Sequence, residues 1–287
     1  MTPGLFAGKN VIVQGITGTH GSFHTRAMIR YGTNIIAGTS PTKAGTLFDD
    51  HIPVLASIAE IQKDKRVDIS VIFVPAAHAR SAILEAIAAK IPLIVCITEH
   101  IPVHDMLHIS QHLQGSDSVV IGPNSPGVLI PGSNLLGITP AQLSTTGDTA
   151  LVSRSGTLTY EAMDLLSRRG HGQKYIIGIG GDMIRGTSFI DCLKLFEADP
   201  DIKKIVMIGE IGGIDEIKAA DVIASTITKP VYAYVAGHSA PTGVQMGHAG
   251  AIMGTNELES AAAKTAYLKK SGTVVARSVT DLIDRIT

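Results

Sequence analysis

The segment VIVQGITGTHG, residues 11–21, decides the fold expected for this chain. The β-branched residues at 11–13 are typical of a buried strand, the glycines at 15, 18 and 21 of a tight turn, and residues 23–31 of a helix. A helix that starts after such a turn presents free backbone N–H groups and a positive dipole end, which favour an anion such as a phosphate. The segment therefore predicts the first strand, turn and helix of a parallel α/β sheet.

Strand and helix patterns alternate along most of the remaining chain. Further strands are expected at residues 34–37, 69–74, 93–97, 149–152, 174–179, 204–208 and 231–235, and further helices at 76–89, 103–113, 160–168, 189–197, 215–225, 257–270 and 279–286. Continuous apolar strands that alternate with helices are typical of a parallel sheet covered on both faces. The pattern predicts a doubly wound α/β fold.

A stretch rich in Gly and Pro interrupts this alternation. It runs from GPNSPG at residues 122–127 to the proline at 140, and helix formers are scarce in it. We interpret it as the connection between two domains, which also suits a chain of 287 residues. The expected limits are residues 1–123 for the first domain, 124–147 for the connection and 148–287 for the second domain.

Composition limits the class of protein. The chain has 24 Lys and Arg and 25 Asp and Glu, so a nucleic-acid partner held by bulk charge is not expected. Cys96 and Cys192 lie in apolar runs and are expected to be reduced core thiols, with no disulfide or metal site. No secretory apolar core precedes the polar residues 8–10, and no apolar run is long enough to span a membrane. We therefore expect a cytoplasmic protein, or a mitochondrial-matrix protein if the source is eukaryotic.

The glycine turn at residues 15–21 is the first candidate binding segment. Its spacing, G-x-x-G-x-x-G, is looser than the dinucleotide fingerprint, and no carboxylate follows the second strand to bind ribose hydroxyls. Lys43 stands there instead. This chemistry favours a ligand with an additional phosphate, such as CoA or NADP. The alternative is a glycine-rich turn that binds nothing.

Two further segments follow strands of the expected second domain. SRSGTLT at residues 153–159 again leads from a strand into a helix, and its hydroxyls could cap that helix or contact an anion. In MIGEIGG, residues 207–213, Glu210 stands at the end of a strand, where it could accept a hydrogen bond from a histidine ring. The alternative for each segment is a helix cap without a ligand.

GHAGAI at residues 247–252 contains a histidine among small residues. Because bulky neighbours are absent, a large charged group can approach His248 closely, and imidazole can form a covalent intermediate by attacking an electrophile. The alternative is a histidine in a tight turn before a helix.

Seven motifs occur together and in a fixed order. They are GITGTHG, ITE at residues 97–99, GPNSPG, SRSGTLTYE, GIGGD at 178–182, MIGEIGG and GHAGAI. This set, which spans nearly the whole chain, resembles the alpha subunit of succinyl-CoA synthetase (succinate–CoA ligase). The resemblance implies a Rossmann-like CoA-binding domain followed by a flavodoxin-like ligase domain that carries a phosphohistidine.

The resemblance also implies a role for each candidate residue. His248 is implied as the phosphohistidine, and Glu210 as the residue that stabilises it. Residues implied to bind CoA are Thr17, Gly18, Thr19, His20, Lys43, Ile97, Thr98 and Glu99. Residues implied to bind phosphate or the acid are Asn124, Ser153, Ser155, Gly156, Thr157 and Tyr160.

The implied reaction joins a dicarboxylic acid to CoA. A nucleotide phosphorylates His248, the phosphoryl group passes to the acid, and the CoA thiol attacks the acyl phosphate. The resemblance implies that an ATP-grasp beta subunit binds the Mg-ATP or Mg-GTP. The choice of nucleotide and an αβ or (αβ)₂ assembly stay open.

Several residues depart from the family pattern. They are His20, Ser125, Met183, Arg185, His238 and the loop after Gly254. Because none of them is His248 or Glu210, the phosphoryl chemistry is expected to be intact. The identity of the acid stays open, and a malate–CoA ligase is the alternative. A CoA-binding regulatory module and an NADP-dependent oxidoreductase are disfavoured, the first by His248 and Glu210 and the second by the second phosphate-binding helix start at residues 153–159.

Overall fold

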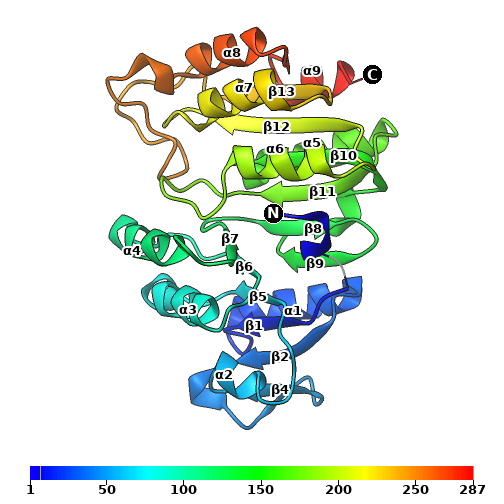
Figure 1. Ribbon diagram of the computed structural model, residues 1–287, viewed down its shortest axis with the longest axis vertical. Coiled ribbons are helices and arrows are strands. Elements are labelled where there is room, and N and C mark those ends of the chain that lie inside the picture. The colour runs from blue at the N-terminus through cyan, green and yellow to red at the C-terminus, as the bar shows by residue number, and fades with distance from the viewer. Residues whose placement is uncertain (7, 287) are drawn as a thin grey trace.

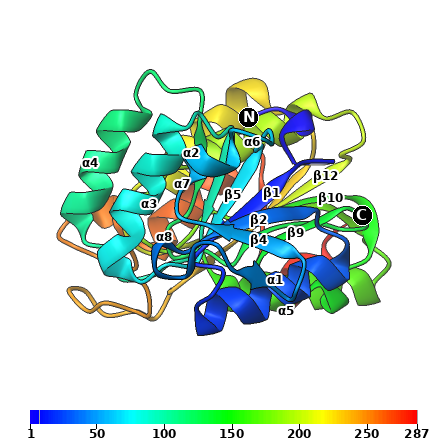
Figure 2. The same cartoon turned by 90° about the horizontal axis from the view of Figure 1, so that it is seen from below.

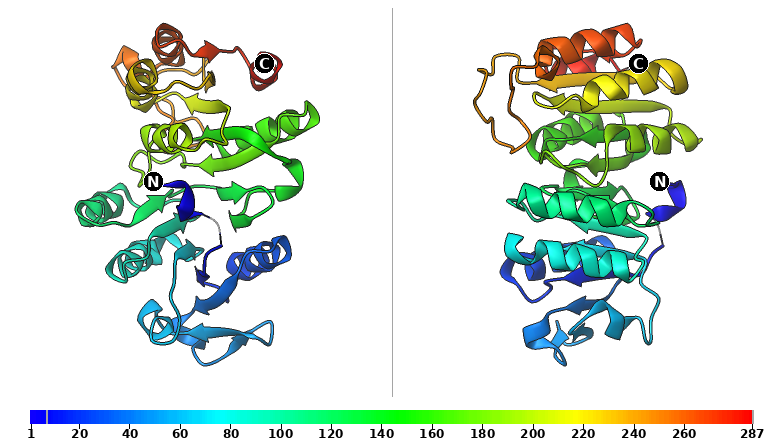
Figure 3. Two further views of the ribbon diagram at one scale, coloured as in Figure 1. Left: turned by 45° about the vertical axis from the view of Figure 1, so that its right-hand side comes forward. Right: turned by 60° about the vertical axis from the view of Figure 1, so that its left-hand side comes forward.

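Two sheets, stacked along the long axis of the molecule, organise the chain (Figure 1). The computed structural model describes residues 1–6 and 8–286, and the strands of these residues form two seven-stranded sheets. The first sheet lies in the blue to cyan half of the molecule and the second in the green to red half, as Figure 3 shows from two further sides.

The first sheet has the strand order β3-β4-β2-β1-β5-β6-β7. All neighbouring pairs are parallel except β3 with β4. Numbered in chain order, the parallel strands follow the order 3-2-1-4-5-6 of a Rossmann fold. The elements are β1 (Val11–Gln14), α1 (Thr19–Tyr31), β2 (Ile35–Thr39), β3 (Leu47–Phe48), β4 (Ile52–Leu55), α2 (Ile58–Ile61), β5 (Ile69–Ile72), α3 (Ala76–Ala88), β6 (Leu93–Cys96), α4 (Val103–Leu113) and β7 (Val119–Ile121).

The second sheet has the order β14-β13-β12-β10-β11-β8-β9. Its five parallel strands follow the order 2-1-3-4-5 of flavodoxin-like folds, so the predicted α/β fold class is confirmed for both domains. The elements are β8 (Gly127–Ile130), β9 (Asn134–Gly137), β10 (Thr146–Ser153), α5 (Gly156–Arg168), β11 (Gln173–Gly178), α6 (Phe189–Ala198), β12 (Lys204–Glu210), α7 (Asp215–Thr226), β13 (Val231–Ala236), α8 (Ala261–Lys270), β14 (Val274–Val275) and α9 (Val279–Asp284). Short 3-10 helices lie at Pro3–Leu5, Pro41–Lys43, Ala141–Leu143 and Glu257–Glu259.

The stretch expected to be a connection between domains, residues 124–147, needs a correction. It contains β8 and β9, which pair antiparallel with each other, and β8 pairs antiparallel with β11. These residues therefore extend the second sheet rather than only link two sheets. The prediction was wrong here because a hairpin lacks the strand–helix alternation on which it rested.

Some helix limits also differ from the predicted ones. Helix α1 starts at Thr19, four residues before the predicted start, because its N-cap is Gly18, which has no polar side chain to mark the boundary. The helix predicted at residues 257–270 is divided at Ser260, whose hydroxyl accepts a hydrogen bond from the N–H of Ala263 and so starts α8.

A shared core joins the two sheets. Helices α3 and α4 cover one face of the first sheet and α1 lies on the other, as the view from below shows (Figure 2). Beside α1, Thr33 exchanges hydrogen bonds with Leu135 of β9, at 2.9 and 3.0 Å. The buried side chains of Met28 in α1 and Leu136 in β9 belong to one continuous hydrophobic cluster. The domains are therefore packed against each other, which fixes the space between them.

Leu136→Ala should destabilise the whole protein. The Leu136 side chain is fully buried where β9 meets the first domain, so its truncation leaves a cavity that should cost about 2–5 kcal/mol. Urea unfolding followed by circular dichroism measures this cost. The control is Leu107→Ala on α4, where the side chain is 47% exposed and the change should be small. Equal stability of the two variants would contradict a shared core.

Candidate active site

The predicted site segments lie at the points where strand order reverses. In an open parallel sheet, ligands bind beyond the carboxyl ends of the strands at such a point. In the first sheet this is between β1 and β5, and the glycine turn follows β1. In the second it is between β10 and β12, which end at Ser153 and Glu210.

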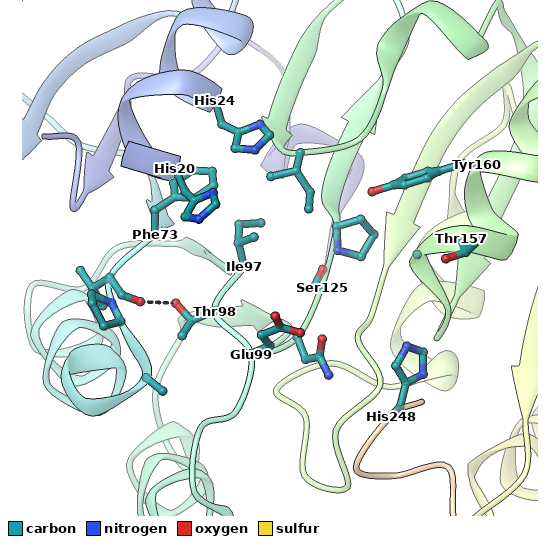
Figure 4. Close-up of a pocket in the computed structure, with 17 residues that line it drawn as sticks. His20, His24, Phe73, Ile97, Thr98, Glu99, Ser125, Thr157, Tyr160 and His248 are labelled. Carbon is teal, nitrogen blue, oxygen red and sulfur yellow. Dashed lines mark hydrogen bonds between the residues drawn. The ribbon is translucent and has the colours of Figure 1, made fainter. Parts of the chain in front are cut away.

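A cavity of about 620 Å³ lies between the two domains (Figure 4). His20 and Thr98 line it from the first domain, and Tyr160 and His248 from the second. The predicted site residues that line this cavity are His20, Ile97, Thr98, Glu99, Asn124, Gly156, Thr157, Tyr160 and His248. Residues predicted from distant segments therefore share one space.

The other predicted residues lie outside this lining. Thr17 donates a hydrogen bond to the Ser40 hydroxyl at 2.9 Å, which ties the glycine turn to the end of β2. Lys43 is exposed at the end of the 3-10 helix that follows. Gly18 and Thr19 are exposed at the start of α1. Glu210 lies behind His248, Ser153 is the last residue of β10, and Ser155 lies in the turn before α5.

In the glycine turn, two parts of the backbone lie close together and the start of α1 is left uncovered by side chains. A Cβ atom on Gly21 would lie 2.1 Å from the carbonyl oxygen of Gly15, so only glycine fits there. The N-cap Gly18 has no side chain to bond the first turn of α1, which leaves the N–H groups of that turn for a ligand. His20, in this turn, lines the cavity.

The predicted residues at the start of α5 have two different roles: the serines hold the backbone of the turn, and the two residues that follow line the cavity. The Ser155 hydroxyl accepts a hydrogen bond from the N–H of Leu158 at 3.3 Å, so Ser155 is the N-cap of this helix. The Ser153 hydroxyl donates to the Ser155 carbonyl and accepts from its N–H. Gly156 and Thr157, which follow, line the cavity.

His248 is held by Glu210. Its ring Nδ1 lies 2.8 Å from Oε2 of Glu210, whose side chain is 8% exposed. The hydrogen bond with Glu210 raises the pKa of His248 above its usual value, although burial opposes this shift. A Cβ atom on Gly181 would lie 2.2 Å from Cγ of His248, so glycine is needed to make room for the ring.

A carboxylate and an arginine near His248 are not among the predicted site residues. Asp182 accepts a hydrogen bond from the side chain of Asn124 at 2.9 Å. The Nε atom of Arg154 lies 3.2 Å from Oε1 of Glu210. Asp182 is the last residue of the motif GIGGD, and Arg154 is the second residue of the motif SRSGTLTYE. An arginine directly after a strand, at the edge where ligands bind, is the signal that could have identified Arg154.

The cavity has an aromatic wall in the first domain that the motifs do not indicate. His24 of α1 stacks on Phe73, with ring centroids 5.6 Å apart and planes 5° apart. Burial, together with the neighbouring His20, lowers the pKa of His24. The neutral imidazole is therefore favoured there, which suits a site for a flat or apolar part of a ligand.

The positions that depart from the family pattern have different surroundings. Ser125 is buried; its hydroxyl donates to the Gly178 carbonyl at 2.5 Å and accepts from the Gly127 N–H at 2.9 Å. Arg185 contacts Asp215 and the carbonyl of Asp182, whereas Met183 is 54% exposed. His238 lies 3.4 Å from the hydroxyl of Thr265. The Ser125 hydroxyl is thus committed to the protein framework.

The described residues contain neither a cluster of metal ligands nor a membrane-spanning helix. Within residues 1–6 and 8–286, no group of three or more His, Cys, Asp or Glu side chains is placed to hold a metal ion. In the same residues no helix has the length and apolar character that crossing a membrane requires.

Comparison with known families assigns both halves of the chain. The model of the CoA binding domain matches residues 7–100, and the CoA-ligase model matches residues 152–274. The ADP-forming succinate–CoA ligase subunit alpha of Staphylococcus aureus is 47% identical over 251 residues, which are 87% of this chain and 83% of that protein. The corresponding subunit alpha 2 of Archaeoglobus fulgidus is 46% identical over 276 residues, which are 96% of this chain and 95% of that protein.

The chain belongs to the succinate–CoA ligase alpha-subunit family.

Solved structures extend the relationship of this alpha-subunit family member. ATP citrate lyase from Methanosaeta concilii, in complex with (3S)-citryl-CoA, superposes with a TM-score of 0.88 at 26% identity. The match covers 99% of this chain and 51% of that one, so this chain spans about half of the larger protein. An acetyl-coenzyme A synthetase from Ca. Korarchaeum cryptofilum has a TM-score of 0.78 at 22% identity, covers 98% of this chain and 60% of that one, and shares the fold.

Glu210→Gln should lower the pKa of His248 in this alpha-subunit family member. Glutamine keeps an oxygen that can accept a hydrogen bond from the Nδ1–H group, but it lacks the negative charge that stabilises the imidazolium ring. Titration of the His248 ring by NMR measures the change. Glu161→Gln, at an exposed position on α5, is the control and should leave that pKa in place. An unchanged pKa in Glu210→Gln would contradict the contact.

Proposed function

We propose that this chain is the alpha subunit of a succinate–CoA ligase, which interconverts succinate, CoA and a nucleoside triphosphate with succinyl-CoA, nucleoside diphosphate and phosphate. The observation that carries this proposal is the pair formed by His248 and Glu210, with the His248 ring lining the cavity that also reaches the start of α1. This arrangement puts one nucleophilic nitrogen at a space shared by both domains.

The hydrogen bond decides which nitrogen reacts. With the Nδ1 proton donated to Glu210, the lone pair of the neutral ring is on Nε2. In the proposed reaction Nε2 attacks the γ-phosphorus of the nucleotide, the bond from phosphorus to the bridging oxygen breaks, and the diphosphate leaves. The proton stays on Nδ1, where the carboxylate stabilises the positive ring of the phosphohistidine.

Two further displacements complete the reaction. A succinate oxygen attacks the phosphorus, the N–P bond breaks, and succinyl phosphate forms while His248 is regenerated. The CoA thiolate then attacks the acyl carbon, the C–O bond to phosphate breaks, and succinyl-CoA and phosphate result. Because the protein mainly positions charged groups in such steps, the backbone donors at Gly156 and Thr157 are suited to hold the phosphoryl group.

The first domain is proposed to bind CoA. The free N–H groups at the start of α1 suit a phosphate of CoA, and residues Ile97 to Glu99 line the cavity between that helix and His248. Lys43 is proposed to contact CoA from outside the cavity. Asn124 and Tyr160, which line the same space, are proposed to contact succinate.

The nucleotide is proposed to bind to an ATP-grasp beta subunit. Support comes from the relatives, which are named as alpha subunits, and from the two family models, which describe CoA binding and CoA ligation. Phosphorylation of His248 would then require a second chain that supplies Mg-ATP or Mg-GTP. We propose the cytoplasm as the site of this reaction.

His248→Asn should abolish acid-labile labelling. The chain, a purified beta subunit and γ-labelled nucleotide are incubated, and acid treatment distinguishes phosphohistidine, which is lost, from phosphoserine, which survives. We expect label that depends on the beta subunit in the unmodified chain, none in His248→Asn, and slower labelling in Glu210→Gln. His108→Asn on α4 is the control and should label normally.

Acid-labile phosphate on His248→Asn, or full ligase activity without a beta subunit, would refute the proposal. Turnover with a panel of acids decides the substrate. Activity with malate and none with succinate would replace the succinate assignment.

Lys43→Glu should weaken CoA binding without preventing phosphorylation of His248. Reversal of a charge beside a phosphate should cost about 1–3 kcal/mol. Isothermal calorimetry with CoA measures it, with Lys63→Glu, another exposed lysine of the first domain, as the control. Equal CoA affinities in the two variants would remove Lys43 from the site.

A further inference from the structure

Four charged side chains form a buried charge cluster behind His248. They are Arg154, Glu210, Glu216 and Lys264, with side-chain exposures of 2%, 8%, 0% and 0%. Two positive and two negative charges balance within it. Buried charges are costly unless they are paired and hydrogen-bonded, so such a group needs a reason beyond stability.

Arg154 connects this cluster to the loop that carries His248. Its guanidinium lies 3.2 Å from Oε1 of Glu210, the oxygen that does not contact His248. It also donates to the carbonyls of Gly212, at 3.0 Å, and Gly250, at 3.2 Å. Gly250 is two residues after His248. One planar group therefore fixes both the carboxylate and the segment on which the histidine stands.

Glu216 and Lys264 hold Arg154 and the end of β12 in place. Glu216 contacts Arg154 at 3.3 Å and accepts a hydrogen bond from the N–H of Glu210 at 3.1 Å. Lys264 donates to the carbonyls of Glu210 and Gly212, each at 2.7 Å. Burial would raise the pKa of Glu216, but the charges of Arg154 and Lys264 outweigh it and lower that pKa. The Glu216 carboxylate is therefore ionised at neutral pH.

We propose that Arg154 is a positioning residue for phosphoryl transfer, which holds Glu210 and the Gly250 segment so that the His248 ring is presented in one orientation. This inference rests on the proposed function, because it concerns the same histidine. It assigns a task to a residue that contacts neither the cavity nor the reacting nitrogen.

Arg154 also balances the charge that His248 experiences. The charged groups that face the ring are Glu210 at the end of β12, Asp182 after β11 and Arg154 after β10. Both carboxylates raise the pKa of His248, the nearer Glu210 first, whereas Arg154 lowers it. Removal of the positive charge should therefore extend protonation of the ring to higher pH, and a protonated Nε2 cannot attack phosphorus.

Two variants separate geometry from charge. Arg154→Lys keeps the charge but loses the planar set of donors, and we expect phosphorylation of His248 to be about 10- to 100-fold slower. The double variant Arg154→Met with Glu216→Gln removes one charge of each sign. Phosphorylation of His248 should be slow in this double variant too. In a plot of the rate against pH, the fall of the rate on the acid side should move to higher pH. Single-turnover labelling with the beta subunit, from pH 6 to 9, measures both effects.

The control is Lys174→Met, which removes an ion pair with the buried Asp199 at a distant part of the second domain. It should lose stability but keep the rate and its pH dependence. CoA affinity should be unchanged in every variant, because the first domain is intact. Normal labelling rates in the Arg154 variants, or slow rates with no shift of the acid limb in the double variant, would overturn the inference.

Two outcomes keep this inference distinct from the proposed function. If the unmodified chain takes up no label at His248, the proposed function fails first. If it labels normally and the Arg154 variants do as well, only the role of Arg154 fails. Should the Arg154 variants not fold, Glu216→Gln with Lys264→Met removes two supports of the arrangement and should slow labelling; an unchanged rate would overturn the inference.

Discussion

The hydrogen bond between Glu210 and His248 is the contact on which the site depends. It joins the end of a sheet strand to a loop of small residues that has little packing of its own. Without it, the ring would have no fixed tautomer and no fixed direction. The buried cluster around Arg154 and the glycine at 181 both serve this one contact, the first by holding the carboxylate and the second by leaving room for the ring.

The packing of the two domains supplies the rest of the site. His20 and His248 line one cavity because β9 lies against α1 and the hydrophobic core of the second sheet is continuous with that of the first sheet. The hairpin of β8 and β9 therefore fixes the distance between the start of α1, where we propose that CoA binds, and the ring of His248. A flexible linker at residues 124–147 could not do so.

The sequence was a good guide where structure is local. The pattern at residues 11–21 predicts β1, the turn and α1, because each feature depends on neighbours in the chain. It could not predict which strands lie side by side. Arg154 follows the predicted Ser153, yet its partner Glu216 is 62 residues away and becomes its neighbour only through the strand order of the second sheet. The role of Ser125 was likewise hidden, because only the fold commits its hydroxyl to Gly178.

Lys264 has a chemical consequence for a protein that handles activated acyl groups. Burial, although the charge of Glu216 opposes it, lowers the pKa of this amine, and a less basic amine is more readily acylated by acyl phosphates and thioesters. Its side chain is completely buried, and its three contacts use the ammonium hydrogens. The same burial that makes this amine less basic therefore also keeps acyl donors away from it. The fold protects the enzyme from its own chemistry at this position.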